Sequence, residues 1–216
     1  MPVGIEAWFA QVPPITRGWL ACAVLTSLAV QCQMVTPLQL YFSYKSAFTN
    51  VQLWRVFTTF FYFGNISIDF VFHMFFFMRY SRMLEESSFP QRRADYFWLL
   101  LQSAVMLLIL SSLVNMPFLS SPLAFVPIYI WSRRHPSTQI SLFGIVTLTA
   151  PYLPLTLVAF SWLLNGTWRA ALGDLLGCAV AHMCWFLRDV WAREMLGGKG
   201  VWSEAPEVLK RVFGDV

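Results

Sequence analysis

The sequence predicts an all-α membrane protein with six transmembrane helices. Of the 216 residues, 57% are hydrophobic and only 12% are charged, whereas a soluble domain carries about 25% charged residues. The mean hydropathy is +0.58, and a chain this apolar needs lipid to cover its surface. The 20 Phe and 10 Trp residues are typical of lipid-facing helices with aromatic belts at the membrane interface. The apolar runs that predict the spans are 18–35, 56–78, 97–114, 118–131, 139–164 and 170–187.

Some of these runs are short for a membrane crossing, which takes about 20 residues. The run 118–131 is the shortest and contains Pro122 and Pro127. Short spans tilt, lie buried among neighbouring helices, or thin the bilayer locally. We therefore expect at least one of these helices to be enclosed by protein, or the membrane around the chain to be thin.

The positive charges predict the orientation. With six spans both termini lie on one side, and twelve of the 15 Lys and Arg residues then fall on that side. The positive-inside rule makes this side cytosolic, with a six-span domain over 1–195 and a short cytosolic tail over 196–216. The three basic residues on the opposite side are Lys45, Arg55 and Arg169.

Several polar side chains fall inside apolar runs, where they are expensive unless they face protein or water. Asn65, Asp69 and His73 are spaced i, i+4, i+8, so on a helix they share one face. Asp174 and His182 occupy the last run. Two interpretations stay open, because these groups either line a polar cavity or hydrogen-bond one another between helices.

Small residues and helix breakers mark two further features. Gly173, Gly177 and Ala181 form a small-xxx-small pattern that lets another helix approach closely. Gly144, Pro151 and Pro154 fall within the run 139–164 and predict a kink there, which belongs either to a mobile gate or to static packing. The four cysteines form no CxxC pair, so neither zinc nor a disulfide framework is expected. No phosphate-binding loop is present, and we expect no cofactor, no metal and no nucleic-acid partner.

Six short sequence blocks occur in a fixed order over about residues 5–200. The blocks are WFAQVPPITRGW (8–19), LWRVFTTFFYF (53–63), RRADYFWLLL (92–101), YIWSRRHP (129–136), GDLLG (173–177) and LGGKG (196–200). In this order and spacing they resemble the derlins, the pseudoprotease branch of the rhomboid superfamily, and in particular a fungal-type derlin. The resemblance implies a rhomboid-like helical bundle with an interfacial loop between spans one and two.

The comparison with active rhomboids tests for catalysis. The rhomboid nucleophile position falls on Ser120, without the flanking glycines, and the histidine position falls on Asp174. The positions of the oxyanion-stabilising side chains fall on Asp69 and His73. A serine needs a base to take its proton, and a carboxylate, with an ordinary pKa of about 4, is a poor one. The resemblance therefore implies no enzyme activity, the alternative being an active intramembrane serine protease.

The resemblance also implies a function in the endoplasmic-reticulum membrane. Derlins engage misfolded lumenal or membrane proteins in ER-associated degradation and assist their retrotranslocation to the cytosol. The implied partners are those substrates, a membrane ubiquitin ligase complex, a cytosolic AAA ATPase unfoldase (directly or through another subunit), the lipid bilayer and other derlin copies. The alternative within this family is an assembly subunit that only recruits the ligase and the ATPase. Phe213-Gly214 is a fragment of the tail motif by which some derlins dock the ATPase.

The family's Trp-Arg element falls on Trp54 and Arg55, just before the second apolar run. Arg55 lies on the non-cytosolic side, so it is not a topology signal. A tryptophan suits the membrane interface, and a guanidinium can donate to several carbonyls at once. We expect Arg55 to hydrogen-bond loop carbonyls and hold the loop folded.

Overall fold

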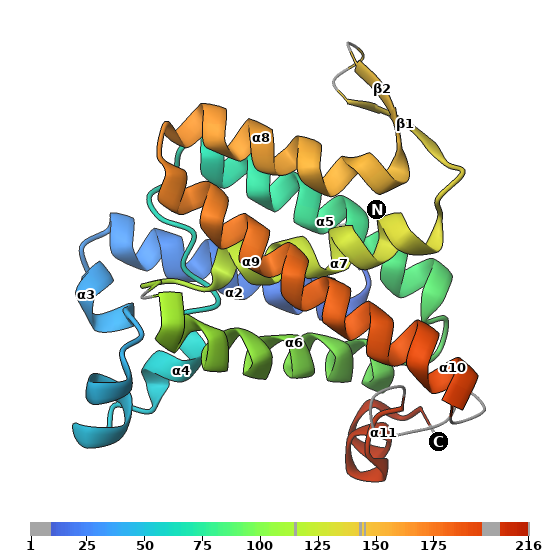
Figure 1. Ribbon diagram of the computed structural model, residues 1–216. Coiled ribbons are helices and arrows are strands. Elements are labelled where there is room, and N and C mark those ends of the chain that lie inside the picture. The colour runs from blue at the N-terminus through green and yellow to red at the C-terminus, as the bar shows by residue number, and fades with distance from the viewer. Residues whose placement is uncertain (1–9, 115, 143, 145, 196–203, 216) are drawn as a thin grey trace, which may run out of the picture.

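The computed structural model describes residues 10–114, 116–142, 144, 146–195 and 204–215, and this part of the chain is mostly helical (Figure 1). Block 196–200 therefore lies outside the described residues. Six helices of 13 residues or more form a bundle in the described part. They are α2 (Pro14–Gln31), α5 (Ile68–Ser88), α6 (Arg93–Val114), α7 (Ser120–Arg134), α8 (Leu153–Asn165) and α9 (Trp168–Trp185).

Helix α7 is the centre of this bundle. It lies between α5, α6 and α9 in Figure 1, and twelve of its 15 residues are buried. Pro122 and Pro127 are therefore surrounded by protein, where neighbouring helices can compensate for the hydrogen bonds that proline removes. The shortest apolar run is thus a core helix, as expected for a span that protein rather than lipid encloses.

The sequence predicted one continuous helix over the second apolar run, and this prediction is wrong. It begins in the short helix α4 (Trp54–Thr58), continues without regular structure, and becomes helical again only at Ile68. Gly64 has φ of +90°, a conformation that glycine adopts at little cost. The Ser67 side chain then accepts a hydrogen bond from the Phe70 N–H and caps α5. The loop after α2 consequently extends to residue 67.

This loop contains three short helical segments, α3 (Pro37–Leu40), the π-helical η1 (Lys45–Thr49) and α4. Large apolar side chains point outward from it, among them Leu38, Trp54 and Phe57. Phe60 and Tyr62 are instead buried, and the Thr59 carbonyl accepts from the Leu119 N–H at 3.0 Å. The loop is thus tied to the start of α7 and exposes the kind of side chains that enter a membrane interface.

The fifth apolar run is only partly helical, which corrects the predicted kinked helix. It begins with an antiparallel hairpin, β1 (Gln139–Leu142) and β2 (Val146–Thr149), with Gln139 opposite Thr149. Gly144 has φ of +73° between the strands. Pro151 lies in the 3-10 segment η2 (Ala150–Tyr152), and Pro154 lies in the first turn of α8, where a missing N–H costs nothing. None of these three residues kinks a helix.

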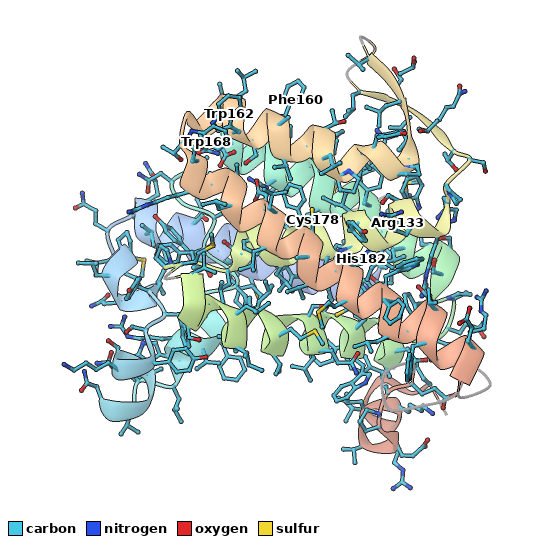
Figure 2. All side chains as sticks on the ribbon, viewed as in Figure 1. Arg133, Phe160, Trp162, Trp168, Cys178 and His182 are labelled. Carbon is cyan, nitrogen blue, oxygen red and sulfur yellow. The ribbon has the colours of Figure 1, made fainter. Side chains whose placement is uncertain are left out.

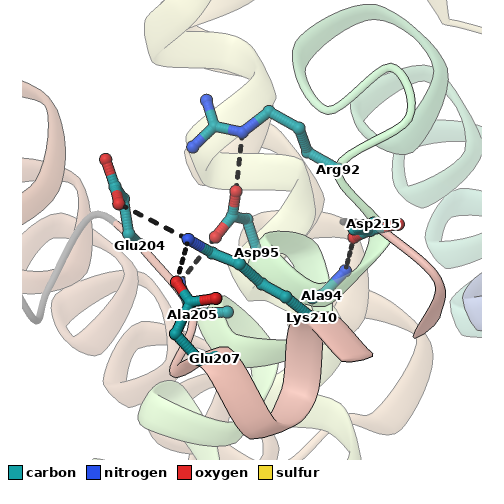
Figure 3. A network of polar contacts seen from close by, with 8 residues as sticks. All are labelled: Arg92, Ala94, Asp95, Glu204, Ala205, Glu207, Lys210 and Asp215. Carbon is teal, nitrogen blue, oxygen red and sulfur yellow. Dashed lines mark hydrogen bonds and ion pairs between the residues drawn. The ribbon is translucent and has the colours of Figure 1, made fainter. Parts of the chain in front are cut away.

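The C-terminal segment folds back onto α6. Helix α9 continues through the π-helical η3 (Phe186–Trp191) and α10 (Ala192–Met195). The tail helix α11 (Glu207–Phe213) then packs beside the first turns of α6, as Figure 3 shows. Asp95 accepts from the Ala205 N–H and Asp215 from the Ala94 N–H, both at 2.6 Å. The tail is therefore docked on the bundle through charge-assisted hydrogen bonds.

Within the described residues, two helical stretches are long and apolar enough to cross a membrane. They are Arg93–Ser112, with hydropathy 1.6, and Trp168–Glu194, with hydropathy 1.5. Ala150–Asn165 is apolar but shorter. Val105 and Ile109 of α6 point outward, as lipid-facing side chains do. The total of six spans and the side on which the termini lie stay predictions.

Candidate functional site

A polar pocket of about 670 Å³ lies where α5, α8 and α9 meet the segment before α7. Its polar lining residues come from four separate parts of the chain, and apolar side chains such as Met116, Phe118 and Leu172 complete the wall. A pocket of this volume is ample for side chains of a bound polypeptide or a small molecule. The polar lining residues are Asp69, His73, Ser121, Ser161, Asn165 and Arg169.

Asp69 is the hub of the polar contacts in this pocket. It lies in the first turn of α5, where a carboxylate is favoured by the helix dipole. His73 follows one turn later, with its Nε2 atom 3.4 Å from the Asp69 Oδ1 atom. The Asn165 amide at the end of α8 donates to the same oxygen at 2.9 Å. Asp69 thus joins α5 to α8, and the predicted one-face relation of Asp69 and His73 holds.

His73 has an aromatic surround on its other sides. Its ring centroid lies 5.9 Å from that of Phe63, 5.8 Å from that of Phe72 and 6.1 Å from that of Phe125. The side chain is only 5% exposed. The imidazole is therefore held in one orientation by packing, with its polar edge toward Asp69.

Asp174 lies just behind the pocket wall, on α9. It is 1% exposed and accepts a hydrogen bond from the hydroxyl of Ser121 on α7. Its neighbour Gly173 and its partner Ser121 both line the pocket. The Asp174 carboxylate therefore does not line the cavity, but its hydrogen-bond partner Ser121 does. The hydrogen-bond partner of Ser121 is thus a carboxylate, whereas serine hydrolases use an imidazole to accept the proton.

Ser120, the residue aligned with the rhomboid nucleophile, does not reach the pocket. Its side chain is buried and donates to the Tyr62 carbonyl at 2.5 Å. This contact ties the loop before α5 to the start of α7. The neighbouring Ser121 is the serine that faces Asp174, one residue later than the sequence comparison indicated.

Besides Asp174, two more predicted cavity residues do not line the pocket. Asn65 precedes α5 rather than sharing its face, because the helix starts at Ile68, and its side chain accepts from the Tyr62 hydroxyl at 3.3 Å. His182 lies outside the pocket, toward the other end of α9. Its Nδ1 atom is 2.7 Å from the Tyr129 hydroxyl, and Arg133 lies close by, as Figure 2 shows. His182 is thus a polar link between α9 and α7.

Asn165, Ser161, Ser121 and Arg169 were not predicted as pocket residues. Asn165 begins an Asn-Gly-Thr sequon, but its amide is engaged with Asp69 and with the Ser161 carbonyl. Its partner Asp69 is 96 residues away, so no local pattern could reveal the contact. Trp162 and Trp168 flank this turn with ring centroids 4.9 Å apart (Figure 2), which marks this end of α8 and α9 as a candidate interfacial belt.

The small-residue pattern of α9 lies against α7, beside the pocket. A Cβ atom added to Gly177 would lie 2.3 Å from the Pro122 carbonyl oxygen. One added to Gly173 would meet side-chain atoms only, the nearest being the Met116 sulfur at 3.5 Å. Ala181 is fully buried. The close helix approach that the pattern predicts is therefore present and is tightest at Gly177.

Arg55 makes the loop contacts predicted for it. Its Nη1 atom donates to the carbonyls of Leu38 at 2.6 Å and Tyr41 at 2.7 Å, and its Nε atom donates to the Gln52 side chain at 2.6 Å. The guanidinium thereby joins α3 to α4 across the loop. Trp54 points outward, 54% exposed. We call Arg55 and these three partners the loop brace.

Glu85 provides a second tether, at the opposite end of α5. It accepts hydrogen bonds from the Ile15 N–H at 3.3 Å, the Thr16 N–H at 3.1 Å and the Thr16 hydroxyl at 2.7 Å. These two N–H groups belong to the first turn of α2, and N–H groups in a first turn have no carbonyl acceptor within their own helix. Burial raises the pKa of Glu85, and the hydrogen bonds to Thr16 and Ile15 oppose that rise. Glu85 therefore fixes the start of α2 against α5.

The described residues contain no group of three or more His, Cys, Asp or Glu side chains placed to hold a metal ion. The pocket instead combines a carboxylate (Asp69), a guanidinium (Arg169), an imidazole and an amide. Such a mixed lining can donate hydrogen bonds to polar groups and accept hydrogen bonds from them.

The bundle and its pocket define a helical membrane protein with a cavity between its helices that combines apolar walls with a few polar side chains. The Der1-like family model matches residues 12–204, and the chain belongs to this family. It is 37% identical to Derlin-2.2 of Zea mays over 227 residues, covering 100% of this chain and 88% of that protein. It is also 37% identical to a probable derlin-2 homolog of Dictyostelium discoideum over 193 residues, 86% of this chain and 75% of that protein.

Family membership places the chain among proteins associated with ER-associated degradation. The derlin resemblance stated from the sequence is thus confirmed. The relatives named above are a plant and a Dictyostelium protein, so the fungal-type assignment stays a prediction.

Proposed function

We propose that this chain engages misfolded lumenal or membrane proteins in the endoplasmic-reticulum membrane and assists their passage to the cytosol. The observation that carries the proposal is the polar pocket, with Asp69, Arg169, His73 and Asn165 between apolar helices. Polar polypeptide is expensive to place in hydrocarbon because its peptide groups lose their hydrogen bonds to water. A cavity that offers both donors and acceptors lowers that cost.

The short helix α8 supports a second part of the proposal, a locally thinned bilayer. Helix α8 has 13 residues, so at 1.5 Å per residue it is about 20 Å long. The hydrocarbon core of a bilayer is about 30 Å thick. Lipid adjusts to such short elements by thinning, which shortens the path that a polar segment has to cross.

The proposed topology has six spans, with both termini cytosolic. The basic residues at the ends of α5, α7 and α9, among them Arg92, Arg134 and Arg188, support it through the positive-inside rule. In this orientation the pocket faces the lumen and the docked tail lies in the cytosol. The driving force comes from elsewhere, because the sequence has no nucleotide-binding loop. The proposed partners are a membrane ubiquitin ligase complex and a cytosolic AAA ATPase, of which the ATPase supplies the force.

Site-specific photo-crosslinking during retrotranslocation of a misfolded client tests this proposal. Crosslinkers at positions 69 and 121 line the pocket, and crosslinkers at 105 and 109 are matched controls on the outward face of α6. The proposal expects client capture at 69 and 121 above the level of the controls. Capture at the controls alone contradicts it, and efficient degradation with no capture at 69 or 121 favours a pure assembly subunit.

We further propose that the chain is not a protease. The pairing of Ser121 with the Asp174 carboxylate supports this, because a carboxylate is a weak acceptor for a serine proton. A serine-reactive phosphonate probe should leave the purified chain unlabelled. Labelling that disappears in Ser120→Ala or Ser121→Ala would establish an active serine and refute the proposal.

A further inference from the structure

A second pocket, of about 260 Å³, lies at the opposite end of the bundle and is lined mainly by arginine side chains. It forms where α5 ends, α6 begins, α7 ends and α9 passes into η3. We call it the arginine pocket. Its lining residues are Ser88, Phe89, Arg92, Arg134, Arg188, Asp189 and Arg193.

The arginines are held in place by contacts within the protein. The guanidinium of Arg134 lies 5.0 Å from the centre of the Phe89 ring, and that of Arg188 lies 5.2 Å from it. Phe89 is itself 3% exposed. Asp189 accepts from the Arg134 Nε and Nη2 atoms at 3.0 and 2.7 Å. These contacts orient two guanidinium groups before any ligand arrives, which reduces the entropy cost of binding.

The charge of this pocket is unbalanced. Two carboxylates pair with its arginines, Asp189 with Arg134 and Asp95 with Arg92 at 2.6 Å. Counted over the described residues, four guanidinium groups and two carboxylates leave an excess of positive charge. Arg188 interacts electrostatically with Arg134 and Arg92 and also with Asp95 and Asp189. Like charges held this close repel one another, and a bound anion relieves that repulsion.

A phosphomonoester matches the excess charge and the donor geometry. It carries about −1.5 to −2 charges at neutral pH and three acceptor oxygens. Arginine is the preferred partner for such groups because its planar fork donates two parallel hydrogen bonds. A guanidinium has five N–H donors, and Asp189 takes two of those of Arg134.

The surroundings favour a phosphate that is attached to a membrane. The span Arg93–Ser112 begins next to the pocket residue Arg92. Phe186 and Trp191 belong to η3, the segment that supplies Arg188, and both are exposed. Exposed aromatic side chains beside a basic pocket at the end of a span are suited to the glycerol and headgroup layer of a bilayer.

The neighbouring polar cluster has the opposite character. Figure 3 shows Lys210 of the tail beside Glu204 and Glu207, with Asp95 between this cluster and Arg92. Glu204 and Glu207 thus lie around the tail helix, and Arg134 and Arg188 lie around Phe89. Arg92, paired with Asp95, lies between the two groups.

We propose that the arginine pocket binds the phosphomonoester headgroup of an anionic phospholipid. The full-length chain in detergent is titrated with dioctanoyl phosphatidylinositol 4-phosphate, with dioctanoyl phosphatidylinositol, and with inositol 1,4-bisphosphate as the headgroup without acyl chains. Binding is measured by thermophoresis. The proposal expects the 4-phosphate lipid to bind about tenfold or more tightly than phosphatidylinositol, the difference expected for one charge-assisted hydrogen bond.

The variant Arg193→Gln tests the assignment to this pocket. Arg193 lines the pocket and is exposed, so its replacement should leave the fold intact and weaken lipid binding about tenfold. The matched control Arg82→Gln removes the same charge from α5 outside the pocket, where Arg82 pairs with Glu86, and should bind as the wild type does.

Three results would overturn the proposal. The first is equal affinity for the two lipids, or equal affinity of Arg193→Gln and Arg82→Gln for the 4-phosphate lipid. The second is binding of inositol 1,4-bisphosphate as tightly as the lipid, which would assign the pocket to a soluble phosphate. The third is binding of a phosphoserine peptide, lost in Arg193→Gln, without any lipid binding, which would assign the pocket to a protein partner.

Discussion

Replacing Gly177 with alanine tests how tightly α9 must approach α7 to form the pocket wall. The added Cβ atom would lie 2.3 Å from the Pro122 carbonyl oxygen and 2.8 Å from its carbonyl carbon and Cα. The two helices would have to separate by at least about 0.7 Å to reach a 3.0 Å contact. Because the opposing atoms are backbone in a buried helix, no side-chain rotation can relieve the clash.

The expected loss of stability combines two terms. Overpacking in a core costs about 1–3 kcal/mol, and the rigid backbone contact places Gly177→Ala near the upper end. Alanine recovers about 1 kcal/mol of helix propensity relative to glycine. The net loss is therefore about 2 kcal/mol, which corresponds to a Tm lowered by about 4–8 °C for a chain of this size.

The matched control is Gly173→Ala, one helical turn away. Its added Cβ atom would meet the Met116 sulfur at 3.5 Å and the Pro122 ring at 3.7 Å, which are ordinary contacts. This variant keeps the propensity gain without the clash, so we expect its Tm to equal or exceed that of the wild type.

Thermal unfolding in mild detergent can be followed with a thiol-reactive dye. Cys178 and Cys184 are buried and become reactive on unfolding, and the exposed Cys22 and Cys32 can be blocked beforehand. If Gly177→Ala melts at the same temperature as Gly173→Ala, the α7–α9 contact is not tight and the reasoning fails.

Three further predictions concern the tethers. Arg55→Ala removes three hydrogen bonds and should lower the local stability of residues 38–58 by more than about 1.4 kcal/mol. Hydrogen exchange in this segment should then be at least about tenfold faster. Unchanged exchange would contradict the role of the loop brace. Asn165→Ala should cost about 1 kcal/mol and raise hydrogen exchange at the end of α8. Phe72 of α5 and Phe160 of α8 also stack, with ring centroids 5.9 Å apart, and unchanged protection would show that this stacking suffices to hold α8. In Glu85→Gln a side-chain NH2 group faces N–H donors of α2 in place of a carboxylate oxygen. The free energy of unfolding should fall by about 1–3 kcal/mol, measured by thermal unfolding. The control Glu86→Gln should not show this loss, because Glu86 pairs with Arg82 at the surface.

The sequence predicted the local chemistry of several positions correctly. The i, i+4 relation of Asp69 and His73 holds because both lie in one regular helix. Arg55 was expected to donate to loop carbonyls, and a guanidinium beside an irregular loop finds such acceptors whatever their exact position. Gly177 was expected to allow close packing, and the small-xxx-small spacing is a property of the helix itself.

Other positions depended on turns that the apolar runs concealed. Asn65 was placed on a helix because hydrophobicity continues through 56–63, yet Gly64 and the Ser67 cap end that continuity. Gly144 was expected to kink a helix, but β-branched residues on both sides of it pair as a hairpin. Hydropathy measures burial or lipid exposure, and it does not distinguish a strand or a packed loop from a helix.

Composition and apolar runs determined the class of protein, because they are local properties of the sequence, and the quoted sequence blocks indicated the family. Only the tertiary structure decided which side chains meet. Ser121 rather than Ser120 faces Asp174, His182 lies with Tyr129 away from the pocket, and Asn165 reaches Asp69 across 96 residues. Such contacts depend on the rotation and crossing of whole helices, which packing at residues like Gly177 sets and no local pattern encodes.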